Sequence, residues 1–155
     1  MIGALDGLRI LDLSRILAGP FATQNLADLG ADVIKVEAPW GDDTRKWGPP
    51  FIENESENSA AYFHSCNRGK RSICIDMKTE EGLILLRKLA MHADIIVENM
   101  KVGTLTRLGL DPYEIIKEKP ELIICQISGF GQNGPRSNQP GYDVAVQGIS
   151  GIKSV

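Results

Sequence analysis

Residues 8–37, LRILDLSRILAGPFATQNLADLGADVIKVE, decide the fold class. Aliphatic and polar side chains alternate over residues 8–13, which predicts a β-strand. Pro20 suits the first position of a helix that runs to about Leu29, and Gly30 is typical of the residue that ends one. The aliphatic residues in 32–37 predict a second strand. This stretch is therefore a strand–helix–strand unit, from which parallel sheets are built.

The alternation of strands and helices continues along the chain. Further strands are predicted over residues 72–76, 93–98 and 122–127. Thr79 and the acidic residues after it predict the N-cap of a helix that ends near Met91. Short helices are expected near 104–108 and 112–117, and a last one from about Tyr142. Residues 38–58 show no period and predict a long functional loop. The pattern as a whole predicts an α/β fold with a mostly parallel sheet.

Length and composition exclude several function classes. The chain has 155 residues, 43% of them hydrophobic and 24% charged, as expected for one globular domain. Its net charge of −3 argues against non-specific nucleic-acid binding, and no stretch is long enough for a membrane span. Cys66, Cys74 and Cys125 fit no zinc pattern, so we expect no metal and three reduced, mostly buried thiols. We therefore expect an intracellular protein, in a bacterial cytoplasm, a mitochondrion or a peroxisome.

A glycine-rich motif follows the fifth predicted strand. Residues 129–134 spell GxGxxG, the pattern of a dinucleotide-binding turn. That turn normally follows the first strand and opens a helix, whereas Pro135 follows here. We interpret the motif as a flexible turn.

Basic residues gather before the third strand in an otherwise acidic chain. Arg68, Lys70 and Arg71 form either a solvated surface corner or a phosphate site, and both alternatives stay open. Arg15 and Arg107 lie near the carboxyl ends of predicted strands, where ligands bind in open α/β sheets. The residues alone predict an α/β domain that binds a phosphorylated small molecule.

Several short segments resemble the family III CoA-transferases, and together they cover nearly the whole chain in order. They are LAGP (17–20), LGADVIKVE (29–37), GDDTR (41–45), NRGKRS (67–72), VEN (97–99) and SGFG (128–131). The resemblance implies that residues 1–155 form the N-terminal part of a Rossmann-like CoA-binding large domain. A smaller domain and a returning segment would lie outside this chain. Full-length members are expected to form interlocked homodimers.

The resemblance also implies the site residues. The expected CoA pocket consists of Leu17, Ala18, Ile75, Lys78, Asn99, Met100 and Arg107. Lys78 and Arg107 would serve the phosphates, and Arg45, Arg68, Lys70 and Arg71 are further candidates for phosphate contacts. Some relatives carry an arginine directly after the second strand, where this chain has Ala38-Pro39. Arg45 or Lys35 would then compensate, or the adenine is held differently.

The implied reaction transfers coenzyme A between an acyl-CoA thioester and a free carboxylic acid through an aspartyl-CoA intermediate. The aspartate nucleophile is expected beyond Val155, so we expect no catalytic residue in this chain and no activity from it alone. Tyr142, in a Gly-Tyr-Asp triplet, is a candidate for the active-site wall.

Two alternatives to the transferase are a racemase and a binding module. α-Methylacyl-CoA racemases carry a histidine where Tyr142 stands, and a phenol with an ordinary pKa of about 10 is a poor base at neutral pH. The other alternative is a non-catalytic CoA-binding or interaction module. In every case the expected ligand is coenzyme A or its thioester, with no metal, nucleic acid or membrane as partner.

Overall fold

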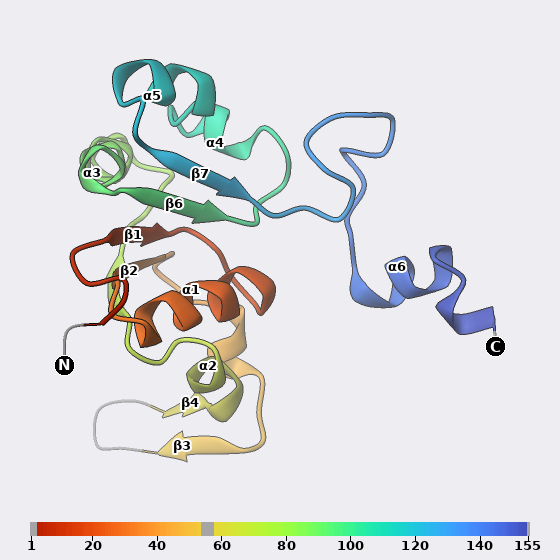
Figure 1. Cartoon of the computed structure of the whole chain (residues 1–155). Helices are drawn as coiled ribbons and strands as arrows, with labels where there is room; N and C mark the ends of the chain where they lie inside the picture. The colour runs from red at the N-terminus through yellow and green to blue at the C-terminus, as the bar shows by residue number, and fades with distance from the viewer. Residues whose placement is uncertain (1–2, 54–57, 155) are drawn as a thin grey trace.

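The computed structural model describes residues 3–53 and 58–154, and its centre is a five-stranded parallel sheet. The strands are β1 (Arg9–Asp12), β2 (Asp32–Glu37), β5 (Arg71–Cys74), β6 (Ile95–Glu98) and β7 (Ile123–Gln126). Their order is β5-β2-β1-β6-β7, with every neighbouring pair parallel (Figure 1). The predicted α/β class is confirmed. The strand order reverses between β1 and β6, which is the point where such sheets bind ligands.

Helices cover both faces of the sheet. α1 (Ala18–Asp28) packs on one face, over a buried cluster that includes Ile10 and Val33. α3 (Glu80–His92), α4 (Thr104–Arg107) and α5 (Pro112–Glu118) cover the other face, over a larger cluster that includes Leu11 and Ile96. Ile10 and Leu11 are neighbours in β1 and point to opposite faces because side chains alternate along a strand.

The helix boundaries follow the predicted capping chemistry. The Thr79 hydroxyl accepts a hydrogen bond from the Gly82 N–H at 3.1 Å, so Thr79 caps α3 as predicted. Gly30 has a φ of 104° and follows the end of α1, as expected for a glycine there. α1 begins at Ala18 rather than at Pro20. Pro20 is the third residue of α1, and proline fits at this position because the N–H groups of a first helical turn have no intrahelical partner.

The segment after β2 contains more structure than predicted. It holds a 3₁₀ turn, η1 (Asp43–Lys46), the antiparallel strands β3 (Phe51–Glu53) and β4 (Asn58–Ala60), and α2 (Ala61–Ser65). Figure 1 shows β3, β4 and α2 at the end of the sheet away from β7. The prediction of a long loop is wrong here because strands of three residues are too short to show a period.

The chain leaves the sheet after β7. Residues 127–142 lead to α6 (Asp143–Ile149) and the 3₁₀ turn η2 (Ile152–Ser154), which lie apart from the sheet (Figure 1). The helix predicted from about Tyr142 is confirmed, with Tyr142 as its N-cap. Apolar side chains of α6, including Val144 and Ile149, are exposed. Gly131 and Gly134 have positive φ angles in a segment without helix or strand, so the motif does not open a helix as a dinucleotide-binding turn does.

The cysteines differ from their predicted burial. Cys66 is buried, but Cys74 and Cys125 are exposed. Both belong to edge strands, β5 and β7, which have a neighbouring strand on one side only. In the part of the chain that the structure describes, no helix has the length and apolar character to cross a bilayer.

A buried ion pair joins β1 to the segment before β5. The Lys70 ammonium donates to Asp12 Oδ2 at 2.9 Å, to the Pro20 carbonyl at 2.8 Å and to Asn67 Oδ1 at 2.8 Å. The Lys70 side chain is 2% exposed and that of Asp12 is fully buried, and burial lowers the pKa of Lys70. An ammonium has three protons to donate, so these contacts use its full capacity.

A second buried pair holds the end of β2. Arg45 donates to both Glu37 oxygens, from Nε and Nη2, at 2.7 Å each. The Ser72 hydroxyl and the Asp42 N–H also donate to this carboxylate, at 2.6 and 2.9 Å. Burial alone raises the pKa of Glu37, but these four hydrogen bonds outweigh it and lower the pKa to about 2.

The first prediction concerns the pair of Lys70 and Asp12. We expect Lys70→Met to lower the free energy of unfolding by about 3–5 kcal/mol, because it leaves a buried carboxylate without its counter-charge. Urea denaturation followed by circular dichroism measures the change. Arg71→Met is the matched control, since the Arg71–Asp32 pair is solvent-exposed and its loss costs at most about 1 kcal/mol. Equal effects of the two substitutions would contradict the structural role of Lys70.

The second prediction concerns acid stability. The pKa of Glu37 is lower in the folded chain (about 2) than its ordinary value of 4.5, so the folded state binds fewer protons. The stabilisation is therefore complete above pH 4.5 and is lost as the pH falls towards 2. We expect Glu37→Gln to cost about 3 kcal/mol at pH 7 and much less near pH 2. Urea titrations across this pH range measure the free energy of unfolding. Glu114→Gln is the control, because Glu114 forms an exposed ion pair and its substitution should leave the free energy of unfolding unchanged at both pH values. A loss independent of pH would contradict the assignment.

Candidate functional site

A cavity of about 390 Å³ opens at the carboxyl edge of the sheet. Its walls come from the loop after β1, from the end of β2 with the turn that follows, and from the loops after β5 and β6. These four strands include β1 and β6, between which the strand order reverses. The cavity therefore lies where open α/β sheets bind their ligands.

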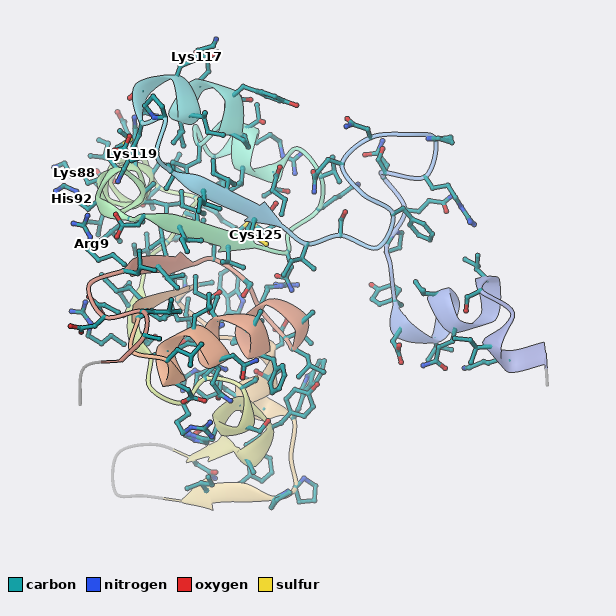
Figure 2. All side chains as sticks on the ribbon, in the orientation of Figure 1. Arg9, Lys88, His92, Lys117, Lys119 and Cys125 are labelled. Atoms are coloured by element: carbon teal, nitrogen blue, oxygen red, sulfur yellow. The ribbon has the colours of Figure 1, made fainter. Side chains whose placement is uncertain are left out.

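A smaller cavity of about 250 Å³ lies at the opposite, amino edge. Figure 2 shows Arg9 and His92 at this edge. Arg9 donates through Nη2 to Asp94 at 3.1 Å, and Arg71 donates to Asp32 at 2.7 Å. Both guanidinium groups are thus neutralised by carboxylates of the chain itself. The carboxyl-edge cavity is the stronger candidate.

The loop after β1 is held in a strained conformation beside the cavity. Ile16 has a φ of 71°, a region that β-branched residues rarely adopt. Asp42 accepts a hydrogen bond from the Ile16 N–H at 3.3 Å. The Asn99 side chain forms two hydrogen bonds with the Arg15 backbone: it accepts from the N–H at 2.9 Å and donates to the carbonyl at 2.7 Å. These contacts fix the backbone that carries the Arg15 side chain.

A third buried ion pair forms part of the cavity wall. The Lys35 ammonium donates to Asp42 Oδ2 at 2.9 Å and to the Ser14 carbonyl at 2.8 Å. The Asp42 carboxylate also accepts from the N–H and the hydroxyl of Thr44, at 3.0 and 2.7 Å. Burial alone raises the pKa of Asp42, but the nearby Lys35 charge and the hydrogen bonds outweigh it and lower the pKa below its usual range. The charge of the Asp42 carboxylate is therefore balanced within the protein rather than by a ligand.

Three further cations line the cavity. Arg15, Lys78 and Lys101 all belong to its walls. The Arg15 side chain is 60% exposed and its nearest carboxylate, that of Asp43, lies at 3.7 Å. The Lys78 ammonium lies over the Trp40 ring. A cavity with such cations at its rim suits an anionic ligand, because guanidinium and ammonium groups form charge-assisted hydrogen bonds to phosphate.

The predicted CoA-binding residues divide into two groups. Lys78, Asn99 and Met100 line the cavity together. The others, Leu17, Ala18, Ile75 and Arg107, are not among its lining residues. Leu17 and Ala18 lie exposed at the start of α1, and Ile75 is buried in the core. Arg107 donates to the hydroxyl of Thr104 at 2.7 Å, and that threonine does line the cavity.

The further phosphate candidates are not brought together at the cavity. Arg45 is paired with Glu37 and Lys70 with Asp12 inside the protein. Arg68 and Arg71 form exposed ion pairs, with Asp28 and Asp32. Tyr142 is 73% exposed on the separate α6 segment.

Two cavity residues, Trp40 and Asp42, were not predicted as parts of the site, and Lys35, predicted as a possible substitute for an arginine at the adenine, is paired with Asp42 instead. Lys35 and Asp42 form the buried pair, and Trp40 lies on the turn between them. One signal was present for Lys35, a lysine at an inward position of an aliphatic strand. Trp40 and Asp42 lie in the aperiodic segment after β2, where pattern analysis has nothing to measure.

Comparison with known proteins relates the chain to one family. A family model described as CoA-transferase family III matches residues 5–155. The chain is 55% identical over 154 residues to a protein from Agrobacterium fabrum named succinate–glutarate CoA-transferase, aligning 97% of this chain with 38% of that protein. It is 48% identical over 155 residues to the Homo sapiens protein named succinyl-CoA:glutarate CoA-transferase, aligning 99% of this chain with 34% of that protein.

Solved structures give the same result. A CAIB/BAIF family protein from Brucella suis superimposes with a TM-score of 0.94 and 56% identity, over 98% of this chain and 40% of that one. Rv3272 from Mycobacterium tuberculosis superimposes with a TM-score of 0.89 and 38% identity, over 99% of this chain and 42% of that one. This chain thus spans 34–42% of the length of these four relatives. Because the family model covers nearly all of its residues, the chain belongs to CoA-transferase family III.

Proposed function

We propose that this chain forms the coenzyme A-binding part of a family III CoA-transferase. The observation that carries the proposal is the family match over residues 5–155 in a chain whose main cavity lies at the switch point of the sheet. Lys78, Asn99 and Met100, expected at the CoA pocket, line that cavity. The transferred acids are dicarboxylic, as the names of relatives at 48–55% identity support.

The cavity cations provide the binding chemistry. Coenzyme A carries a diphosphate and a 3′-phosphate, all anionic at neutral pH. Arg15, Lys78 and Lys101 supply positive charge at the rim, while the Lys35–Asp42 pair keeps the wall beneath neutral. The loop that carries Arg15 is fixed before any ligand arrives, so binding needs little ordering of the backbone.

The proposed reaction uses a carboxylate nucleophile from sequence beyond Val155. An aspartate oxygen attacks the thioester carbon, and the C–S bond breaks to give a mixed anhydride and the CoA thiolate. The thiolate then attacks the aspartyl carbon of the anhydride, which forms an aspartyl thioester and releases the first acid. The second acid repeats the two steps in reverse, so each difficult transfer is divided into easier ones. Asp143 is not proposed as the nucleophile, because it lies on α6 and is not among the residues that line the cavity.

We propose that the separate α6 segment belongs to an interface of the longer protein. Its side chains include exposed Val144, Ile149 and Tyr142, which are costly to leave in water. The partner chain of an interlocked homodimer of the longer protein would cover them.

The third prediction concerns CoA binding. We expect isothermal titration of the 155-residue chain with coenzyme A to show one site, and Lys78→Ala to weaken binding about tenfold, the effect of one charge-assisted hydrogen bond. Lys88→Ala is the matched control, since Lys88 is exposed on α3 and does not line the cavity. Absence of binding to a folded chain, or equal effects of the two substitutions, would contradict the proposal.

The fourth prediction concerns exchange. A longer protein that contains this chain and the aspartate-bearing segment should convert succinyl-CoA and glutarate into glutaryl-CoA and succinate, measured by chromatography of the thioesters. The 155-residue chain alone should show no exchange. Exchange by the short chain would place the nucleophile within it, and CoA binding without exchange by the longer protein would favour a non-catalytic module.

A further inference from the structure

Trp40 presents a large aromatic surface at the mouth of the cavity. Trp40 is one of the residues that line the cavity, and it is 52% exposed. Among the described residues of the lining it is the only aromatic one. A tryptophan buries more apolar surface than almost any other side chain when it is covered, so an exposed indole at a cavity mouth fits a site that a flat ligand completes.

The turn that carries Trp40 is rigid. The Gly41 N–H donates to the Ala38 carbonyl at 2.8 Å, which closes a four-residue turn with Pro39 at its second position. Gly41 has a φ of 78°, a conformation that favours glycine.

Two buried ion pairs flank this turn. Glu37, which pairs with Arg45, directly precedes the turn, and Asp42, which pairs with Lys35, directly follows it. The Asp42 N–H also donates to Glu37 at 2.9 Å and so joins the two ends of the turn. The backbone that carries Trp40 is therefore fixed beside the cavity.

A cation lies against the ring. The Lys78 ammonium is 5.2 Å from the centroid of the Trp40 ring, and both residues line the cavity. Such a contact at an exposed site is weak, so the ammonium can exchange it for a phosphate oxygen. A flat aromatic face beside a positive charge is the arrangement that a nucleotide needs, because its base stacks and its phosphate binds a cation.

We propose that Trp40 is the stacking platform for the adenine ring of the bound coenzyme A, with Lys78 bound to a phosphate of the same nucleotide. This inference rests on the proposed function. It also assigns the adenine to a residue other than the nearby basic ones. Arg45 is held by Glu37 at 2.7 Å and Lys35 by Asp42 at 2.9 Å, both within the protein.

The test uses adenosine 3′,5′-bisphosphate and pantetheine, which represent the two halves of coenzyme A, on the 155-residue chain. The chain has two tryptophans, Trp40 and Trp47. Trp47 contacts Tyr62 edge-on at 5.5 Å, does not line the cavity and is 49% exposed, so it is a matched control. In Trp47→Phe, where Trp40 is the reporter, we expect adenosine 3′,5′-bisphosphate to quench the fluorescence and pantetheine to leave it unchanged. In Trp40→Phe, the remaining fluorescence of Trp47 should respond to neither.

Affinities from titration calorimetry complete the experiment. We expect Trp40→Ala to weaken adenosine 3′,5′-bisphosphate about tenfold, the usual effect of losing one base–aromatic stack, and to leave pantetheine unchanged. Trp40→Phe should lose less, because it keeps an aromatic face. Trp47→Phe should bind both probes as the unaltered chain does.

The outcomes separate this inference from the proposed function. If coenzyme A binds but Trp40→Ala keeps its affinity for the nucleotide, or loses affinity for pantetheine equally, the platform is overturned and the proposed function stands. If neither coenzyme A nor the nucleotide binds to a chain shown to be folded by circular dichroism, the proposed function is overturned and the platform with it.

Discussion

The carboxyl edge of the sheet depends on the buried ion pair between Lys35 and Asp42. Both side chains are at most 2% exposed, so each has lost hydration worth several kcal/mol. The Lys35 ammonium also donates to the Ser14 carbonyl, and the Asp42 carboxylate also accepts hydrogen bonds from Thr44 and from the Ile16 N–H. The pair and its partners come from three separate segments of the chain. To satisfy the pair, β2, the loop after β1 and the start of η1 must adopt one arrangement.

This constraint explains why a strained loop persists beside the cavity. The left-handed conformation of Ile16 costs about 1–3 kcal/mol and lasts only where surrounding contacts hold it. Asp42 binds the Ile16 N–H, and Asn99 binds Arg15 through two hydrogen bonds. The edge is thus shaped by contacts within the protein rather than by a ligand. A ligand that arrives there meets cations and an aromatic ring already in place, which reduces the entropy lost on binding.

Much of the fold could be predicted because its main elements are periodic or capped. β2 was predicted with its observed bounds, and Thr79 with its acidic neighbours marked the start of α3. The hairpin of β3 and β4 could not be predicted, since three residues do not define a period. The same aperiodic segment contains Trp40 and Asp42. The part of the site that pattern analysis missed is therefore the part whose conformation is set by turns and ion pairs instead of by periodic burial.

The basic residues show why a charge cluster in a sequence does not locate a binding site. Lys70 is 58 residues from Asp12, and only the strand order brings them together. Asp12 and Glu37 end the adjacent parallel strands β1 and β2, so both carboxylates reach the same edge of the sheet. They are buried there and must each be neutralised, and the nearest basic side chains serve that purpose. Cations for a ligand then have to come from loops further out, beyond the ends of the strands. Lys78, in the loop after β5, satisfies this condition. Sequence spacing alone could not show that Lys78 is available to a ligand whereas Lys70 is buried against Asp12.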